Sequence, residues 1–153
     1  MRKSKRILII NGVNLNMLGF REPEQYGTIT LKELEKDLHA YSFGLGIDIE
    51  TFQSNIEGEI VEKIHESREH FDGIILNAGA YTHTSIAILD ATKAVHIPTV
   101  EVHISDVDER EEFRKHSFVS LIALETIKGK GFGGYLMAID FLKNYITDEK
   151  SAD

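Results

Sequence analysis

The chain has 153 residues, 42% of them hydrophobic, which fits one compact domain, 1–153, that buries most of its apolar surface without outside help. Its formal charge of -8 argues against a polyanion such as nucleic acid as the main partner, and the lack of cysteine excludes disulfides, thiolate metal ligands and a cysteine nucleophile. Residues 1–6 are basic, but the apolar run that follows is too short for a signal peptide or a membrane span. We therefore expect a cytoplasmic protein without a membrane partner.

Strand-like apolar runs alternate with helical patterns along the chain. The strands are expected at 6–10, 47–53, 73–76, 99–104 and 122–127, and the helices at 31–44, 56–64, about 84–95 and about 134–146. Such alternation predicts a parallel sheet that is covered by helices on both faces. We expect an α/β fold, a flavodoxin-like three-layer sandwich with a five-stranded parallel sheet in the order 2-1-3-4-5 and a frayed tail at about 148–153.

The loop after the first strand, residues 11–27, is longer than most strand-to-helix connections. It is polar and contains three Asn, one Arg and one Tyr. Loops at the strand ends of such scaffolds carry chemistry. We interpret residues 14–27 as a functional flap.

Polar side chains follow three of the predicted strands at their carboxyl ends, which is where open parallel sheets bind ligands. The first strand ends at Asn11 and Asn14, the third at Asn77 with His83 close behind, and the fourth at 101–106. Because these ends meet at one edge of the sheet, we expect the side chains to share a cleft.

Each candidate also has a purely structural interpretation. Asn14 and Asn77 could tie down their own turns, and His83 could support the start of the next helix. Glu101 and His103 share one face of their strand, where they could form a structural ion pair, or Glu101 could orient His103 as a proton donor. The position of His103 at the end of its strand favours the second interpretation.

Two further segments have mainly structural explanations. The charged run at 106–115 is typical of a solvated helix face, although Arg110 and Arg114 would share one face of a helical turn there, from which one of them can reach inward. The glycine-rich run at 128–134 lacks the ending of a phosphate-binding loop and follows the last strand, so a tight turn explains it better.

Four blocks of sequence carry a resemblance to a known family: NGVNLNMLGFREPEQYG at 11–27, NAGAYTHTS at 77–85, EVHIS at 101–105 and REEFRKHS at 110–117. In this order and with these spacings, the chain resembles the type II 3-dehydroquinate dehydratases, small flavodoxin-like enzymes of the shikimate route. The resemblance runs nearly end to end, and four ordered blocks are far more specific than one short motif.

The resemblance implies reversible anti elimination of water from 3-dehydroquinate to 3-dehydroshikimate through an enolate, with no cofactor, metal or Schiff base. It implies that Tyr26 is the general base and that Arg21 stabilises its phenolate. His103 would protonate the departing hydroxyl with Glu101 as its orienter, and Asn14 would help to stabilise the enolate.

Further roles implied by the resemblance concern substrate binding. They fall on Asn77, His83, Asp90, Ile104, Ser105 and Arg114. Asn77 and the backbone amides of 104–105 would hold the substrate carboxylate, while His83 and Arg114 would bind its hydroxyls. Asp90 would reach the site of a neighbouring subunit, because members of the family form trimers, usually four of them in a dodecamer.

A tyrosine that acts as a base needs strong stabilisation of its phenolate. We predict that the flap closes over the substrate, excludes water and brings Arg21 onto Tyr26. Gly19 and Gly27 are candidate hinges, and Pro23 would stiffen the segment between them.

Five positions depart from the family pattern: Val13, Ala78 and Leu121, where Pro is common, Leu89, where Arg is frequent, and Asp106, where Asn is usual. None of them removes a group with an implied chemical role. We expect a weaker Michaelis constant or altered assembly before loss of the reaction.

Several rival interpretations have less support. A phosphorylated receiver domain needs an Asp where this chain has Asn77, and a flavin carrier needs a Ser/Thr-rich first loop. Metal binding by His83, Glu101, His103 and Asp106 lacks a motif or a tight carboxylate cluster. A catalytically inactive paralogue would not need to retain both proposed catalytic groups. The sequence leaves open whether the reaction serves aromatic biosynthesis or quinate breakdown.

Overall fold

The protein, represented by a computed structural model, is described over residues 4–151, with side chains to residue 147. It contains a five-stranded sheet in the order β2-β1-β3-β4-β5 in which all neighbouring strands are parallel. The strands are β1 (Arg6–Asn11), β2 (Asp48–Gln53), β3 (Gly73–Asn77), β4 (Thr99–His103) and β5 (Glu125–Lys128). The predicted strand order is confirmed.

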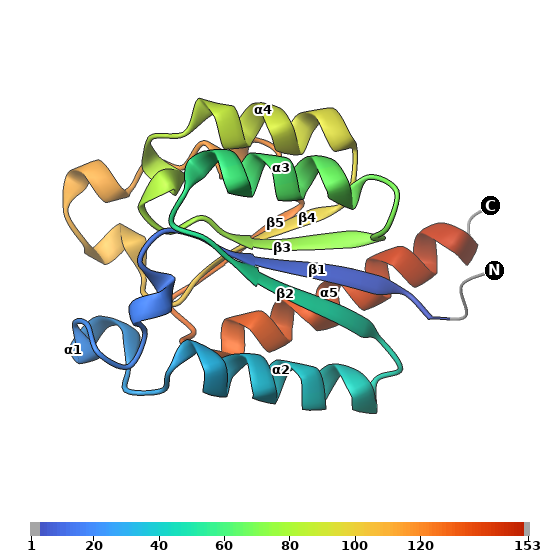
Figure 1. Ribbon diagram of the computed structural model, residues 1–153, viewed down its shortest axis with the longest axis horizontal. Coiled ribbons are helices and arrows are strands. Elements are labelled where there is room, and N and C mark those ends of the chain that lie inside the picture. The colour runs from blue at the N-terminus through green and yellow to red at the C-terminus, as the bar shows by residue number, and fades with distance from the viewer. Residues whose placement is uncertain (1–3, 152–153) are drawn as a thin grey trace.

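Helices cover both faces of this sheet (Figure 1). Helices α2 (Leu31–Gly44) and α5 (Gly133–Ser151) pack on one face, and α3 (Glu57–Ser67) and α4 (Ile86–Val95) pack on the other. A single turn of helix, α1 (Pro23–Tyr26), lies within the flap. The three-layer α/β architecture is therefore as predicted.

Two helix starts show how local sequence sets these boundaries. The hydroxyl of Thr30 accepts a hydrogen bond from the Glu33 amide at 3.2 Å and so caps α2. Helix α4 is different, because Ser85 caps it by accepting from the Ile88 amide at 2.9 Å. Helix α4 begins at Ile86, two residues after the predicted start near residue 84, and residues 79–83 form a separate 3-10 turn that leaves His83 outside the helix.

Two other boundaries differ from the prediction. The apolar run at 122–127 is only partly strand, because Ile122 and Ala123 pack against the core beneath α3 and α4 while β5 begins at Glu125. The first part of the run is only partly buried, and it packs outside the sheet. At the other end, α5 extends to Ser151, beyond the predicted end near 146; fraying at 148–153 stays a prediction, and 152–153 lie outside the described residues.

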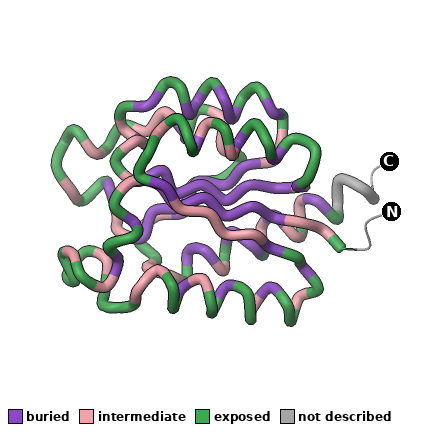
Figure 2. The backbone as a smooth tube through the Cα atoms, viewed as in Figure 1, coloured by how far each residue is buried: buried purple, intermediate pink, exposed green. Residues whose placement is uncertain are grey.

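The central strands are buried on both faces (Figure 2). Every residue of β3 and β4 is buried, and alternate side chains of β1 enter different cores: Ile7 and Ile9 face α2 and α5, and Leu8 and Ile10 face α3 and α4. The polar residues at the ends of these strands, Asn11, Asn77 and His103, are buried as well. Buried polar groups need hydrogen-bond partners within the protein or on a ligand.

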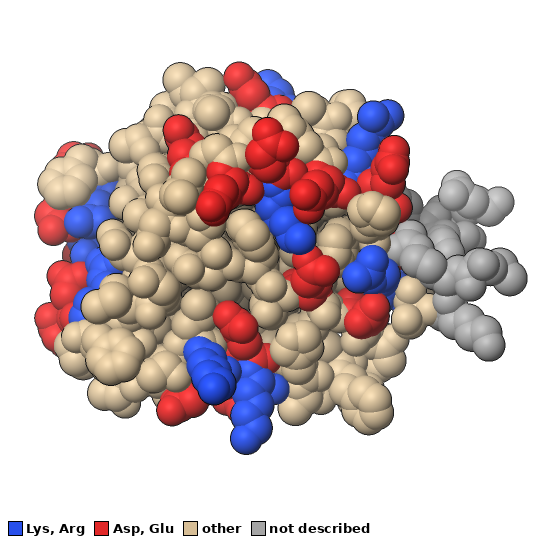
Figure 3. Space-filling model, viewed as in Figure 1, with Lys and Arg blue, Asp and Glu red and all other residues tan. Residues whose placement is uncertain are grey.

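Charges on the exposed helices are mixed and mainly acidic. Acidic side chains gather over α3 on the face shown in Figure 3, where Lys63 pairs with Glu50 at 2.6 Å and Glu66 at 3.5 Å. Within residues 4–151, no helix has the length and apolar character needed to cross a membrane.

Candidate active site

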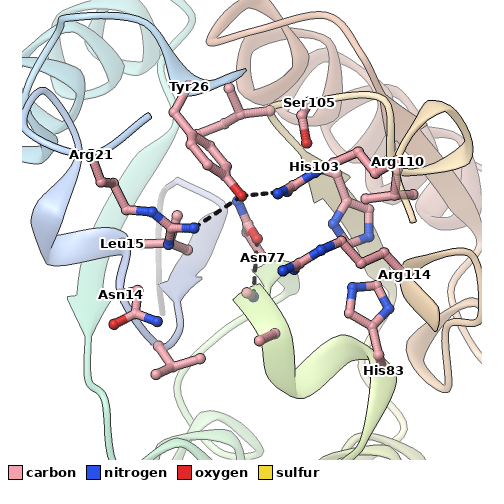
Figure 4. A pocket seen from close by; sticks show the side chains of 15 residues that line it. Asn14, Leu15, Arg21, Tyr26, Asn77, His83, His103, Ser105, Arg110 and Arg114 are labelled. Atoms are coloured by element: carbon pink, nitrogen blue, oxygen red, sulfur yellow. Dashed lines mark hydrogen bonds between the residues drawn. The ribbon is translucent and has the colours of Figure 1, made fainter. Parts of the chain in front are cut away.

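A cleft lies at the carboxyl ends of β1, β3 and β4, bordered by the flap and by the loop after β4 (Figure 4). It is lined by Val13, Asn14, Leu15, Arg21, Tyr26, Asn77, Gly79, Ala80, His83, His103, Ile104, Ser105, Val107, Arg110 and Arg114. All predicted site residues are among them except Glu101, which lies behind His103, and Asp90. The structure therefore brings four distant segments of the chain to one place.

The first two of these segments meet backbone to backbone. The Gly12 amide donates to the Asn77 carbonyl at 2.7 Å, and a Cβ at Gly12 would lie 2.3 Å from the Ala78 carbonyl oxygen. Gly79 has a φ of +63°, and a Cβ there would lie 2.6 Å from the Val13 oxygen. Only glycine allows this approach, which sets the loops after β1 and β3 against the same cleft.

The phenol oxygen of Tyr26 accepts hydrogen bonds from two arginines (Figure 4). Arg110 Nη1 lies 2.6 Å away and Arg21 Nη2 lies 3.3 Å away, and the Arg21 guanidinium also sits 4.5 Å from the ring centroid. Glu22 holds both arginines, at 3.0 Å from Arg21 and 3.9 Å from Arg110. Two positive charges beside one phenol oxygen stabilise negative charge that develops there.

His103 and Glu101 form a buried pair. His103 Nε2 lies 2.6 Å from a carboxylate oxygen of Glu101, whose exposed fraction is 1%. Burial alone would raise the pKa of the Glu101 carboxyl, but the hydrogen bond and charge of His103 and the hydroxyls of Ser117 and Ser120 outweigh it and lower the pKa to about 2. Because Nε2 donates to an ionised carboxylate, Nδ1 is the ring nitrogen left to exchange a proton with a ligand.

The lowered pKa of Glu101 predicts a loss of stability in acid. A carboxyl that titrates at about 2 in the fold and near 4.5 when unfolded adds stability that is fully present above the higher value and is lost as the pH falls toward the lower one. We expect the difference in unfolding free energy between the wild type and Glu101→Gln, measured in urea, to shrink between about pH 5 and pH 2. A difference that stays constant over this range would contradict the assignment.

His83 lines the cleft and does not cap α4, which is capped by Ser85. Its Nδ1 donates to the His116 carbonyl at 2.6 Å. Partial burial lowers the pKa of His83 despite that bond, and the positive charges of His103 and Arg114 lower it further. The ring is therefore neutral near pH 7 and presents Nε2 as a hydrogen-bond acceptor.

A buried network fixes Asn77. Its amide nitrogen donates to the Tyr135 hydroxyl at 2.9 Å, and that hydroxyl donates to Asn11 Oδ1 at 2.5 Å. The Asn77 oxygen accepts from the Gly79 amide at 3.2 Å. Burial raises the pKa of Tyr135, so its hydroxyl stays protonated and keeps both bonds. The second N–H of the Asn77 amide is left for the cleft.

Removal of the Tyr135 hydroxyl should therefore affect both the stability of the fold and the position of Asn77 in the cleft. Tyr135→Phe leaves Asn77 and Asn11 each with one unpaired buried group, which is expected to cost about 1–3 kcal/mol in unfolding free energy and to raise KM. Urea unfolding and steady-state kinetics measure both effects. Tyr145→Phe, on the same helix and stacked on Phe141, is the control and should change neither. Equal behaviour of the two variants would refute the role of this network.

Comparison with known proteins agrees with this geometry. Residues 5–143 match the profile of the family described as "Dehydroquinase class II". The chain belongs to the class II dehydroquinase family. A curated relative from Neosartorya fischeri, "Catabolic 3-dehydroquinase 2", is 52% identical over 144 residues, 94% of this chain and 96% of the relative. "3-dehydroquinate dehydratase" of Dinoroseobacter shibae is 49% identical over 95% of this chain and 97% of the relative.

A solved class II dehydroquinase has the same fold. The crystal structure of the type II dehydroquinase from Butyrivibrio crossotus matches this chain with a TM-score of 0.91 at 46% identity, covering 93% of this chain and 99% of that one. The resemblance of the four sequence blocks is thereby confirmed at the level of the family and of the fold.

Sequence reasoning missed one residue of this dehydroquinase site. Arg110 makes the shorter of the two contacts to Tyr26, although only Arg114 was assigned from the block that both share. The available clue was the expectation that Arg110 and Arg114 share one face of a helical turn, and both line the cleft. Arg21 already contacts Tyr26 in the structure, so flap closure is not needed to bring the two residues together. The closure of the flap stays a prediction.

Asp90 lies apart from the cleft, exposed on α4. Two of the departures from the dehydroquinase pattern have local explanations. The Leu121 amide donates to the Phe118 carbonyl at 3.2 Å, a bond that proline cannot make. Asp106 accepts from the Asp108 amide at 3.0 Å and so caps a short 3-10 turn.

The loop between β5 and α5 forms the predicted tight turn. Gly129 and Gly131 have φ values of +73° and +58°, and their amides donate to the carbonyls of Ser105 and Ile104 at 3.0 and 3.1 Å. These bonds fix the backbone of 104–105 at the edge of the cleft. In the part of the chain that the structure describes, no group of three or more His, Cys, Asp or Glu is arranged to hold a metal ion.

Proposed function

We propose that this chain is a hydro-lyase that eliminates water reversibly from 3-dehydroquinate to give 3-dehydroshikimate. The observation that carries the proposal is the pairing, in one cleft, of a phenol held by two guanidinium groups with an imidazole backed by an ionised carboxylate. The names of relatives about 50% identical over nearly the whole chain support it. The four blocks supply every group that the reaction needs.

Tyr26 acts first, as the base that removes the proton beside the ketone. One guanidinium at ~4 Å contributes only ~1 kcal/mol in water but ~4 kcal/mol at an effective dielectric constant of ~20. Arg110, with a side-chain exposed fraction of 9%, is in the drier position, and Arg21, at 27%, is the more exposed. Both guanidinium groups contact the phenol oxygen, where they stabilise the negative charge that develops on it.

The enolate formed in this step lies close to Asn14. This residue has a φ of +68°, and its backbone N–H donates to Asn55 Oδ1 at 2.9 Å. Gln53 donates to the same Asn55 oxygen at 3.1 Å. The backbone of the residue is thus held from outside the flap, and its side chain is available to the enolate oxygen, directly or through a water molecule.

His103 completes the elimination. Its Nδ1 gives a proton to the departing hydroxyl, while Nε2 keeps its bond to Glu101. The base comes from the flap and the acid from the end of β4, and in the proposed anti elimination they act on opposite faces of the substrate. No cofactor or metal enters any step of the proposal.

The substrate is held by groups around the pair. The backbone amides of Ile104 and Ser105 and the side chain of Asn77 bind its carboxylate, and His83 and Arg114 bind its hydroxyls. Arg114 is oriented by Glu111, at 2.7 Å from its Nε. Closure of the flap about Gly19 and Gly27, which have φ values of +91° and +77°, excludes water.

We further propose a trimer, assembled as a dodecamer, in which Asp90 serves the site of a neighbouring subunit. The exposure of Asp90 on α4, together with exposed Ile86 on the same helix, supports a contact there. Light scattering coupled to size exclusion tests the assembly: a mass of one subunit would refute it. We place the enzyme in the cytoplasm. The names of the relatives include a catabolic one, which fits use of a reversible reaction in either biosynthesis or breakdown.

The test is an assay of the purified chain with 3-dehydroquinate. The product has a conjugated double bond, so a rise in ultraviolet absorbance is expected with the wild type and none with a matched amount of Tyr26→Phe. Absence of the band with folded wild type would favour the second candidate function, an inactive paralogue that only binds ligands.

The two arginines should differ in their effect on turnover. Arg110 is closer to the phenol oxygen and less exposed than Arg21, so Arg110→Ala is expected to lower kcat by about 10²–10³ and Arg21→Ala by about 10–10². Arg114→Ala, which does not touch Tyr26, should raise KM and change kcat less than either of these variants. An unchanged kcat in Arg21→Ala would contradict this account of activation.

A further inference from the structure

The Glu101 carboxylate accepts four hydrogen bonds, of which His103 supplies one. One oxygen accepts from His103 Nε2 at 2.6 Å and from the Ser117 hydroxyl at 2.5 Å. The other accepts from the hydroxyls of Ser120 at 2.5 Å and Thr126 at 2.9 Å. A carboxylate that is 1% exposed is thus surrounded by donors on both oxygens.

The three hydroxyls are fixed by backbone structure. Thr126 lies on β5 directly opposite Glu101 in the strand register. Ser120 lies in a 3-10 turn (Val119–Leu121), and its amide donates to the Ser117 hydroxyl at 3.1 Å, which orients that hydroxyl toward the carboxylate. The adjacent Phe118 amide donates to the Thr82 carbonyl at 3.0 Å, which ties the turn to the loop after β3.

A buried histidine–glutamate pair can hold its shared proton in two ways. The proton can stay on the imidazole and leave two opposite charges, or it can move to the carboxyl and leave two neutral groups. Burial favours the neutral arrangement because it removes both charges from low dielectric. Hydroxyl donors favour the charged arrangement, because they bind an ionised carboxylate more strongly than a neutral carboxyl.

We propose that Ser117, Ser120 and Thr126 are positioning residues that keep the shared proton on His103, so that the imidazole enters each turnover as a charged general acid. The proposal rests on the proposed function. It concerns residues that do not line the cleft and touch the reaction only through Glu101 and His103.

Other charges near the pair oppose this state. Arg110, Arg114 and His83 line the same cleft as His103, and the two arginines disfavour a further positive charge on the imidazole. Glu111, next to both arginines, is exposed. Whether the shared proton stays on His103 therefore depends on how strongly the ionised form of Glu101 is stabilised. The three hydroxyls provide that stabilisation by hydrogen bonding.

The test compares variants that lose or keep the hydroxyls. Thr126→Val replaces the hydroxyl by a methyl group of the same size, and Ser120→Ala removes the second donor to the same oxygen. We expect the double variant to lower kcat by about tenfold or more with KM changed less than about threefold, and the alkaline limb of the kcat–pH profile to move to lower pH. Thr126→Val alone should move the alkaline limb less than the double variant does. Thr126→Ser keeps a hydroxyl at this position and should show the wild-type profile.

A second readout does not depend on activity. Nitrogen-15 NMR of the His103 ring, assigned with His103→Ala, should show both ring nitrogens protonated at neutral pH in the wild type and a neutral ring in the double variant. This result would stand even if the wild type failed to convert 3-dehydroquinate, which would refute only the proposed function. The proposal would be overturned if the folded double variant kept both the wild-type alkaline limb of the kcat–pH profile and the wild-type ring signal. If the double variant does not fold, the same result in folded Thr126→Val would overturn it.

Discussion

Tyr26→Phe is expected to lower kcat by about 10²–10⁴, the usual contribution of a positioned general base. The change removes one oxygen and keeps the ring, which still stacks on the Arg21 guanidinium at 4.5 Å. KM for 3-dehydroquinate should therefore change little. Steady-state kinetics by the ultraviolet assay measure both constants.

The control for Tyr26→Phe is its thermal unfolding, which should match that of the wild type because the Tyr26 ring is only partly buried. Tyr81→Phe offers a second control in a neighbouring loop, since its hydroxyl bonds to the Asn55 carbonyl rather than to the arginines. Turnover within tenfold of the wild type in Tyr26→Phe would remove this residue from the mechanism.

His103→Ala should be the other variant of large effect, with kcat lowered by about 10²–10⁴ and substrate binding largely retained. The fold should tolerate the change, because Glu101 keeps the three hydroxyl donors after it loses the imidazole. Calorimetric titration with 3-dehydroquinate measures binding directly in a variant that turns over so slowly.

Glu101→Gln is the companion to His103→Ala. It leaves the imidazole in the cleft but removes the negative charge behind it, so an intermediate loss of kcat is expected. If His103→Ala raised KM and left kcat unchanged, the residue would bind substrate rather than donate a proton, and the assignment of the acid would be wrong.

The sheet was predictable because its evidence is local and repeated. Buried apolar runs and capped helical patterns alternate along the chain, and few topologies accommodate that alternation. The predicted fifth strand was less accurate, since Ile122 and Ala123 are partly buried against a helix layer rather than within the sheet. Periodicity reports burial and does not distinguish the surface that provides it.

The site was predictable to the extent that its groups follow strand ends. Asn77 and His103 are identified by that position, and Tyr26 by the resemblance of the flap block. Arg110 and the hydroxyls around Glu101 could not be identified in the same way. Their roles depend on contacts between residues far apart in the sequence, such as Arg110 with Tyr26 and Thr126 with Glu101, which no local pattern records.

The division of labour between base and acid can be tested in heavy water. The base alone should exchange the proton beside the ketone of 3-dehydroquinate for deuterium, whereas product requires the acid as well. We predict that His103→Ala incorporates deuterium into recovered 3-dehydroquinate, above the rate without enzyme, while forming almost no product, and that Tyr26→Phe does neither. Exchange that persists in Tyr26→Phe, or that is lost in folded His103→Ala which still binds substrate, would contradict the account.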